Sequence, residues 1–286
     1  MKETILAIVK IGLPLTVMAS MFAQGMIIAL SHMVLFRQQP VLMLRSLAVV
    51  LFLVPLAVLV ILILLKPPPA VTIGLSILAA SPAAPLMLVK IPKKGGSLAY
   101  MAGLHLCLAL LALFTVPLTL DLFARLLGFH AEVGVIAVAR VVGITILLPV
   151  CLGILVQTLF PRVAGTIGPA LAKICALALM ALILCVVALT YSFLLKMDHM
   201  SYLVLALVVT ASIGIGHGLG PRDPQERTTL AMESAARHPG LALTIASLNF
   251  SPDKALPVLV PYLAVFAGVS TIYLHLRKRR LSRLFT

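Results

Sequence analysis

The sequence predicts an all-α polytopic membrane protein with nine transmembrane helices. Of the 286 residues, 62% are hydrophobic and only 10% are charged, whereas soluble domains are about half apolar and a quarter charged. The apolar residues form long blocks, and many blocks reach the roughly 20 residues that a helix needs to cross a bilayer. Helices suit such blocks because lipid offers no hydrogen-bond partner to an open backbone.

Nine apolar blocks, separated by short polar breaks, give the expected membrane spans. They cover about 5–30, 44–65, 70–90, 96–119, 133–159, 168–195, 200–220, 227–250 and 255–276. We expect a single transmembrane domain over 1–286, with halves at about 1–119 and 133–276.

The basic residues predict the orientation of the chain. An odd number of spans places the termini on opposite sides, and fourteen of the 22 Lys and Arg residues fall in breaks on the side of the C-terminus, against six on the other. The positive-inside rule therefore predicts an outer N-terminus and a cytoplasmic C-terminus in the inner or plasma membrane. It also accounts for the net charge of +14 without a nucleic-acid partner.

Two of the nine spans are interrupted near their middles. The third carries Ser81 and Pro82, with Pro85 close behind, and the eighth carries Pro239 and Gly240. Proline removes a backbone donor and clashes with the preceding turn. The two spans run in opposite directions, one in each half, as in inverted-repeat transporters whose broken helices meet around a substrate site. Either break alone has a plainer interpretation as an ordinary kink of a membrane helix.

The second break carries ionisable groups in an apolar stretch. The segment 233–243 reads ESAARHPGLAL and contains Glu233, Arg237 and His238. An unpaired charge at this depth costs roughly 2.5–3.5 kcal/mol on insertion scales. Glu233 and Arg237 are four residues apart, so on a helix they share a face and we expect them to pair. The alternative to a functional pair is an ion pair that only stabilises the structure.

Three segments resemble the bile acid:sodium symporter family. The stretch ESAARHPGLA (233–242) is similar to an E-x-G-x-Q-N-S-G-L-A motif, LLPVCLGILV (147–156) to L-L-P-x-x-L-G-x-x-V, and SPAA (81–84) to a C-P-G-G crossover. The resemblance implies a core and a panel subdomain, with two crossing broken helices in the core. It also implies uptake of organic anions such as bile salts, sulfated steroids or small carboxylates, usually with sodium.

The sequence departs from this family at the positions that the resemblance assigns to sodium ligands. Those positions hold Val50, Met87, Leu88, Met101, His105 and Arg237. Only Glu233 keeps an oxygen ligand, and sodium requires several hard oxygen ligands. We therefore do not expect sodium coupling. Arg237 is expected to take the place of one sodium ion, at the end of a half-helix where a cation offsets free carbonyl groups. Histidine exchanges protons near neutral pH, so His105 is a candidate proton carrier if it faces the same site.

The expected function is secondary transport of organic anions by alternating access, either proton-coupled or uncoupled. The free N–H groups that begin the second half-helices favour an anionic ligand. A sodium symporter with atypical ligands is one alternative, and an integral-membrane enzyme is a second. The eight acidic residues are scattered and form no catalytic set, so we expect no enzyme, metal site or cofactor. The candidate site residues are Ser81, Pro82, His105, Glu233, Arg237, His238, Pro239 and Gly240.

Overall fold

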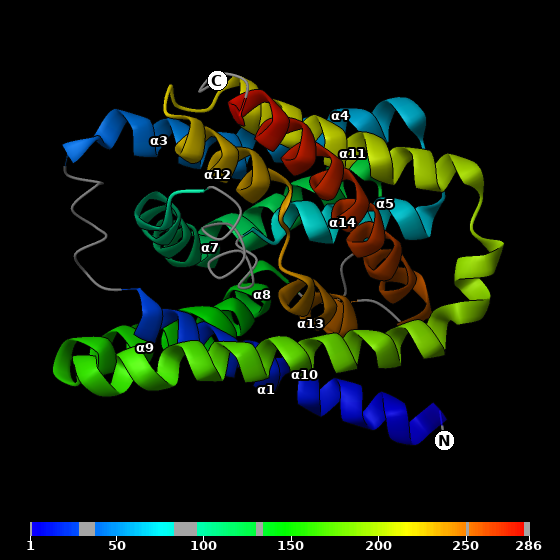
Figure 1. Cartoon of the computed structure of the whole chain (residues 1–286). Coiled ribbons are helices and arrows are strands. Elements are labelled where there is room, and N and C mark those ends of the chain that lie inside the picture. Colours follow the sequence, from blue (N-terminus) through cyan, green and yellow to red (C-terminus); the bar gives the residue numbers. More distant parts are fainter. Residues whose placement is uncertain (1, 29–37, 83–95, 130–133, 250–251, 283–286) are drawn as a thin grey trace.

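The computed structural model describes residues 2–28, 38–82, 96–129, 134–249 and 252–282, and all regular elements in these ranges are helical (Figure 1). In chain order they are α1 (Lys2–Ile27), α3 (Pro40–Ala48), the π-helical segment η2 (Val49–Leu53), α4 (Val54–Leu65), α5 (Pro69–Ala80), α7 (Leu98–Leu127), α8 (Val135–Val142), the π-helical segment η4 (Gly143–Leu147), α9 (Leu148–Leu159), α10 (Pro161–Lys196), α11 (His199–Gly218), α12 (Pro224–Ala235), α13 (Pro239–Asn249) and α14 (Pro252–Ser282).

Each of the nine expected spans contains at least one helix, but several boundaries differ. Helix α7 continues eight residues past the expected end and stops at Gly128, whose positive φ of 72° suits glycine. Helix α10 begins at Pro161, where proline is tolerated because the first helical N–H has no intrahelical partner. Helix α5 ends at Ala80, and residues 83–90 of the third expected span lie outside the described residues.

Six of the described helices are long and apolar enough to cross a membrane, and α5 and residues Ile11–Ile27 form shorter apolar helices. Large apolar side chains on these helices are widely exposed, such as Ile136 at 85% and Leu177 at 70%. Such a surface is stable against lipid rather than water. The chain is therefore a multi-pass membrane protein, whereas the count of nine spans stays a prediction.

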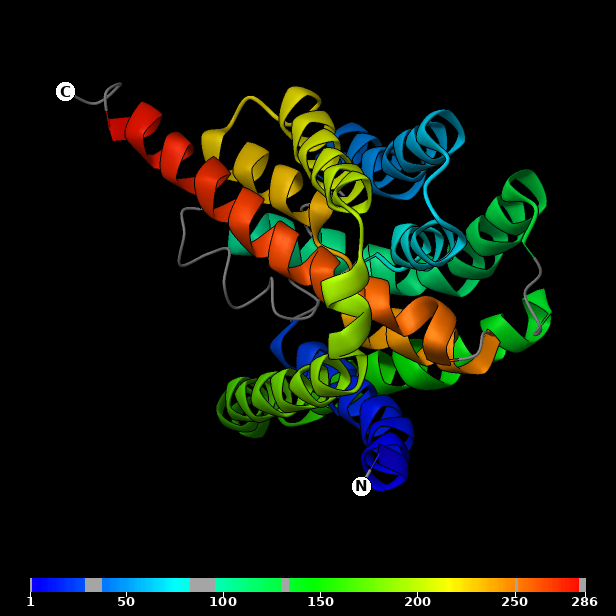
Figure 2. The ribbon, with the colours of Figure 1, turned by 90° about the vertical axis from the view of Figure 1, so that its right-hand side faces the viewer.

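Helices α1, α9 and α10 pack together as a three-helix layer at the bottom of Figures 1 and 2. Within this layer α1 and α9 cross at two glycines. A Cβ on Gly25 would lie 2.8 Å from the Cα of Gly153 and 2.9 Å from the backbone nitrogen of Ile154. Only glycine allows backbones to approach this closely, as at small-residue crossings in membranes.

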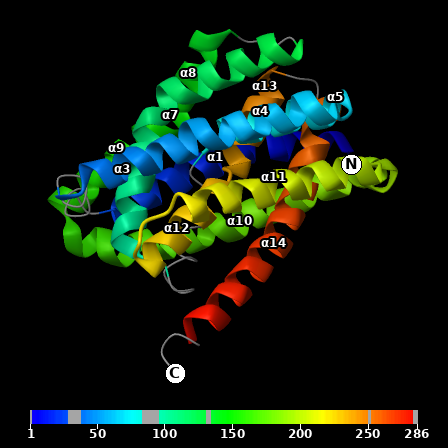
Figure 3. The same cartoon turned by 90° about the horizontal axis from the view of Figure 1, so that it is seen from above.

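Helices α3, α4, α11 and α12 lie on the other side of the molecule, whereas α14 also packs against α10 of the three-helix layer (Figures 1 and 2). Helix α11 packs against α12, α14 and α4, and α14 also packs against α5. Figure 3 shows α14 running obliquely across this group, with its C-terminal end away from the rest. Helix α13 contacts α1, so the segment between α12 and α13 lies where the two groups of helices meet.

Candidate functional site

The end of α5 and the break after α12 touch each other through their backbones. Helix α12 ends at Ala235 and the chain is extended at Ala236, with φ −75° and ψ 108°. Two residues later the backbone N–H of His238 donates to the carbonyl oxygen of Ser81, at 2.9 Å. Ser81 follows the last residue of α5 and is fully buried. The ends of α5 and α12, 155 residues apart in sequence, therefore meet inside the protein.

Arg237 joins the last turns of these two helices. Its Nη1 donates to the carbonyl oxygen of Ala79 at 3.2 Å, and its Nη2 donates to that of Ser234 at 2.8 Å. Carbonyl groups in the last turn of a helix lack intrahelical donors and carry partial negative charge. The side chain is only 4% exposed, so the guanidinium supplies a buried cation where two helix C-termini converge.

Tyr262 of α14 adds a third element to this contact. Its hydroxyl donates to the carbonyl oxygen of Ala235 at 2.8 Å and interacts electrostatically with the side chain of Arg237. The extended segment after α12 is thus held from α5 and from α14. The backbone is not helical here, so some of its carbonyl groups have no partner within a helix. Side chains bind these groups instead, as non-helical backbone inside a membrane requires.

Glu233 pairs with His105 of α7 rather than with Arg237. The Oε1 of Glu233 lies 3.0 Å from the Nδ1 of His105, and the side chains are 0% and 1% exposed. The predicted pair of Glu233 with Arg237 is therefore wrong, and the reason is local. Helix α12 stops at Ala235, so the spacing of four no longer places Arg237 on the face of Glu233.

His238 caps the helix that follows it. Its Nδ1 accepts a hydrogen bond from the backbone N–H of Leu241, at 3.0 Å. Because this nitrogen accepts, the ring proton of a neutral His238 is on Nε2. The next residues, Pro239 and Gly240, begin α13, and a Cβ on Gly240 would collide with Val17 of α1. The three-helix layer therefore reaches the site through α1.

Several buried polar atoms at the site have no hydrogen-bond partner within the described part of the chain. They are Glu233 Oε2, His105 Nε2, Ser234 Oγ and His238 Nε2. Buried polar atoms without a partner cost free energy, and in native proteins they often mark a place for a ligand, an ion or water. The site thus contains both donors and acceptors that a bound species can use.

The structure brings the sequence-predicted residues to one place. Those that follow or form the two breaks are Ser81, Pro82, Arg237, His238, Pro239 and Gly240, while His105 reaches them through Glu233. Tyr262 was not predicted as a site residue from the sequence. A tyrosine in an apolar span is a weak signal, and the carbonyl groups of Ala79 and Ser234 give none, since every residue carries one.

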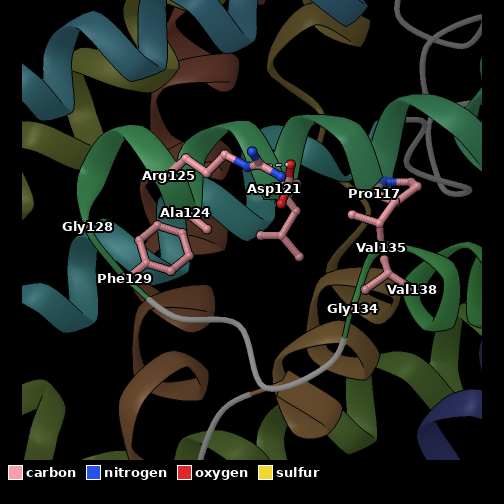
Figure 4. Close-up of a pocket in the computed structure, with 10 residues that line it drawn as sticks. Pro117, Asp121, Ala124, Arg125, Gly128, Phe129, Gly134, Val135 and Val138 are labelled. Carbon is pink, nitrogen blue, oxygen red and sulfur yellow. Dashed lines mark ion pairs between the residues drawn. The ribbon is translucent and has the colours of Figure 1, made fainter.

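A separate cavity of about 370 Å³ lies between the end of α7 and the start of α8 (Figure 4). Asp121 and Arg125 lie at this cavity and pair at 2.9 Å, with the arginine side chain 76% exposed. Exposed pairs of this kind contribute little to stability. None of the predicted site residues lines this cavity.

The helices and the buried charged break define a multi-pass membrane protein with a polar centre. The model of the sodium bile acid symporter family matches residues 14–197. The chain therefore belongs to this family, whose members are transporters and not enzymes, and it is a membrane transporter of the bile acid symporter type. The match ends before α11, so Glu233 and Arg237 follow the matched region. A comparison with curated proteins gives no match.

Proposed function

We propose that this protein is a secondary transporter of organic anions that works by alternating access without sodium, either proton-coupled or uncoupled. The observation that carries the proposal is the buried guanidinium of Arg237, bonded to Ala79 and Ser234 at the ends of α5 and α12. A covalently attached cation at this point offsets the two helix ends. A diffusing cation is then not needed to hold the broken helices together.

An anionic, partly apolar substrate suits the surroundings of this cation. The N-terminus of α13 begins beside it, and helix N-termini favour negative groups. Around the break lie buried apolar side chains, including Val17 and Leu241. Sites of this kind bind ligands that combine a large apolar surface with a few polar groups, which fits a bile-acid-like or small organic carboxylate.

Two buried residues argue against sodium coupling. Met101 and Val50 occupy positions that the family resemblance assigns to sodium ligands, and both are fully buried. A thioether and an aliphatic side chain do not supply the hard oxygen ligands that this cation requires. Sodium coupling stays a second candidate because Glu233 Oε2 is buried without a partner among the described residues and could serve as one ligand.

The architecture that we propose has nine spans, with the N-terminus outside and the C-terminus in the cytoplasm. In it the three-helix layer is the panel, and α5 and the α12–α13 pair are the broken helices of the core. Support comes from the contact between Ser81 and His238 and from the packing of α13 on α1. Alternating access then consists of movement of the core against the panel.

A comparison of sodium chloride with choline chloride at equal ionic strength tests the proposal. We expect the melting temperature of the detergent-purified protein to be the same in both salts. An ion that binds only the folded state adds about 2.7 kcal/mol at a hundred times its Kd, so a sodium-specific increase would restore the sodium symporter. In sodium-free proteoliposomes we expect uptake of at least one labelled probe among taurocholate, a steroid sulfate and a small monocarboxylate.

A further inference from the structure

We infer that this transporter carries one proton with each organic anion, and that the buried pair of His105 and Glu233 holds the proton. The inference rests on the proposed function and names its coupling ion. It starts from the hydrogen bond between His105 Nδ1 and Glu233 Oε1, at 3.0 Å, between two side chains that are almost completely buried. Ionisable groups at membrane depth are rare, and they commonly belong to ion or proton paths.

The pair has a defined place for a proton. The Nδ1–H of a neutral His105 donates to the carboxylate of Glu233. The other ring nitrogen, Nε2, then has a free lone pair, and it has no partner among the described residues. A proton that binds there turns the imidazole into an imidazolium without breaking the hydrogen bond to Glu233. The pair can therefore load and release a proton while α7 and α12 stay connected.

Loading changes the charge of the pair by one unit. With His105 neutral and Glu233 ionised the pair carries −1, and after one proton binds it carries 0. Among the described residues, Tyr100 on α7, Arg237 and His238 interact electrostatically with the pair. Of these, His238 is held neutral because its Nδ1 accepts the hydrogen bond that caps α13.

Among the described residues, α14 places the charged Arg277 on the first turns of α12, where it donates to Thr228 and to the carbonyl oxygen of Pro224. Near the other end of α12, where the pair lies, α14 presents the neutral hydroxyl of Tyr262. Helix α11 presents Gly216, on which a Cβ would lie 2.8 Å from the Cα of Ala231. The pair and Arg237 therefore total 0 before the proton binds and +1 afterwards. A positive site favours an anion, so the proton and the organic anion bind cooperatively.

This cooperativity is reciprocal. If the proton increases the affinity for the anion, the anion increases the affinity for the proton by the same factor, typically about 5- to 150-fold. One proton and one monovalent anion move together without net charge. A pH difference of one unit then supports about tenfold accumulation of the anion, and the membrane potential does not drive it.

The test uses the full-length protein in sodium-free proteoliposomes that contain the pH dye pyranine. The outside is one pH unit more acidic, and the probes are labelled taurocholate, a steroid sulfate and a small monocarboxylate. We expect accumulation of a probe up to about tenfold, acidification of the interior that depends on the probe, and loss of both with a protonophore. His105→Gln keeps a side-chain N–H donor for Glu233 but cannot take up a proton, so it should equilibrate the probe without accumulation or acidification. His199→Gln changes an exposed histidine in the first turn of α11 and should behave like the wild type.

The outcomes separate the two proposals. Wild-type uptake that ignores the pH gradient and leaves the interior pH unchanged would overturn the proton inference and leave the anion transporter standing. Accumulation that persists in His105→Gln would remove the pair as the proton site. If none of the probes is taken up or changes the melting temperature of the wild type, the proposed function itself fails. If His105→Gln does not fold, the same accumulation and acidification measurements on Glu233→Gln, together with the wild-type acidification, decide whether the pair holds the proton.

Discussion

Two of the helix contacts in the described part of the molecule are built in opposite ways. The crossing of α1 and α9 uses Gly25 and Gly153, which remove side chains so that backbones touch. The meeting of α5 with α12 uses Arg237, whose charged side chain fills the space and binds carbonyl groups. In lipid no hydrophobic effect draws helices together, so either packing or polar contacts must do so.

The difference between these contacts indicates which of them can change during transport. Backbone packing at the glycine crossing depends on shape alone, and displacement of either helix loses it. At the break, donors and acceptors are exchangeable, and some buried polar atoms have no partner within the described residues. We therefore expect the three-helix layer to move as a rigid unit and the break to respond to ligands.

Removal of the Arg237 guanidinium should give the largest loss of stability. Arg237→Ala leaves two buried carbonyl groups without their charged donor, and each unsatisfied group costs about 1–3 kcal/mol. We expect a loss of about 3 kcal/mol in detergent stability, with partial recovery on addition of millimolar guanidinium chloride. Arg125→Ala, at an exposed pair, is the control and should change stability little. Full stability of Arg237→Ala would refute the structural role of this cation.

A methyl group at the glycine crossing should give the next largest effect. Gly153→Ala places its Cβ 2.8 Å from the Cα of Gly25, and overpacking of this kind costs about 1–3 kcal/mol. Gly165→Ala on α10 is the matched control, because no atom lies within 4 Å of its Cβ and alanine is the better helix former. Thermal unfolding of both variants measures the contrast, and equal effects would contradict the rigid crossing.

The smallest effect is expected from Tyr262→Phe. The change removes the hydroxyl that donates to Ala235 and contacts Arg237, at about 1 kcal/mol for a typical hydrogen bond. Tyr273→Phe on the same helix removes the hydrogen bond to His217 and should cost a similar amount. We expect only Tyr262→Phe to alter the rate of anion uptake, since Tyr273 lies away from the break. Equal rates in both variants would argue against a role for α14 at the site.

Local chemistry made much of the fold predictable. The apolar blocks mark the helices, and Pro239 together with Gly240 marks the division of the eighth span, because proline disrupts the preceding turn wherever it occurs. Two π-helical segments were not predicted. Each comes just before a proline, Pro55 or Pro149, and the wider turn accommodates the ring and the missing N–H.

The candidate site was predictable in its residues but not in its pairings. Glu233, Arg237 and His238 are recognisable because ionisable groups in an apolar span are costly. The partner of Glu233 is His105, 128 positions away, and the helix end at Ala235 excludes the local partner that the spacing suggested. No periodicity in a sequence encodes a contact between helices that meet only after folding.

The sequence by itself determined that this chain is a helical membrane protein with charged groups at the break in its eighth expected span. These properties follow from hydropathy and from the backbone chemistry of proline, which act over a few residues. The tertiary structure alone decided that Arg237 binds the ends of two helices and that Glu233 binds His105. Buried polar groups take the partners that packing brings within hydrogen-bond distance, because an unsatisfied group in the interior costs more than a rearranged side chain.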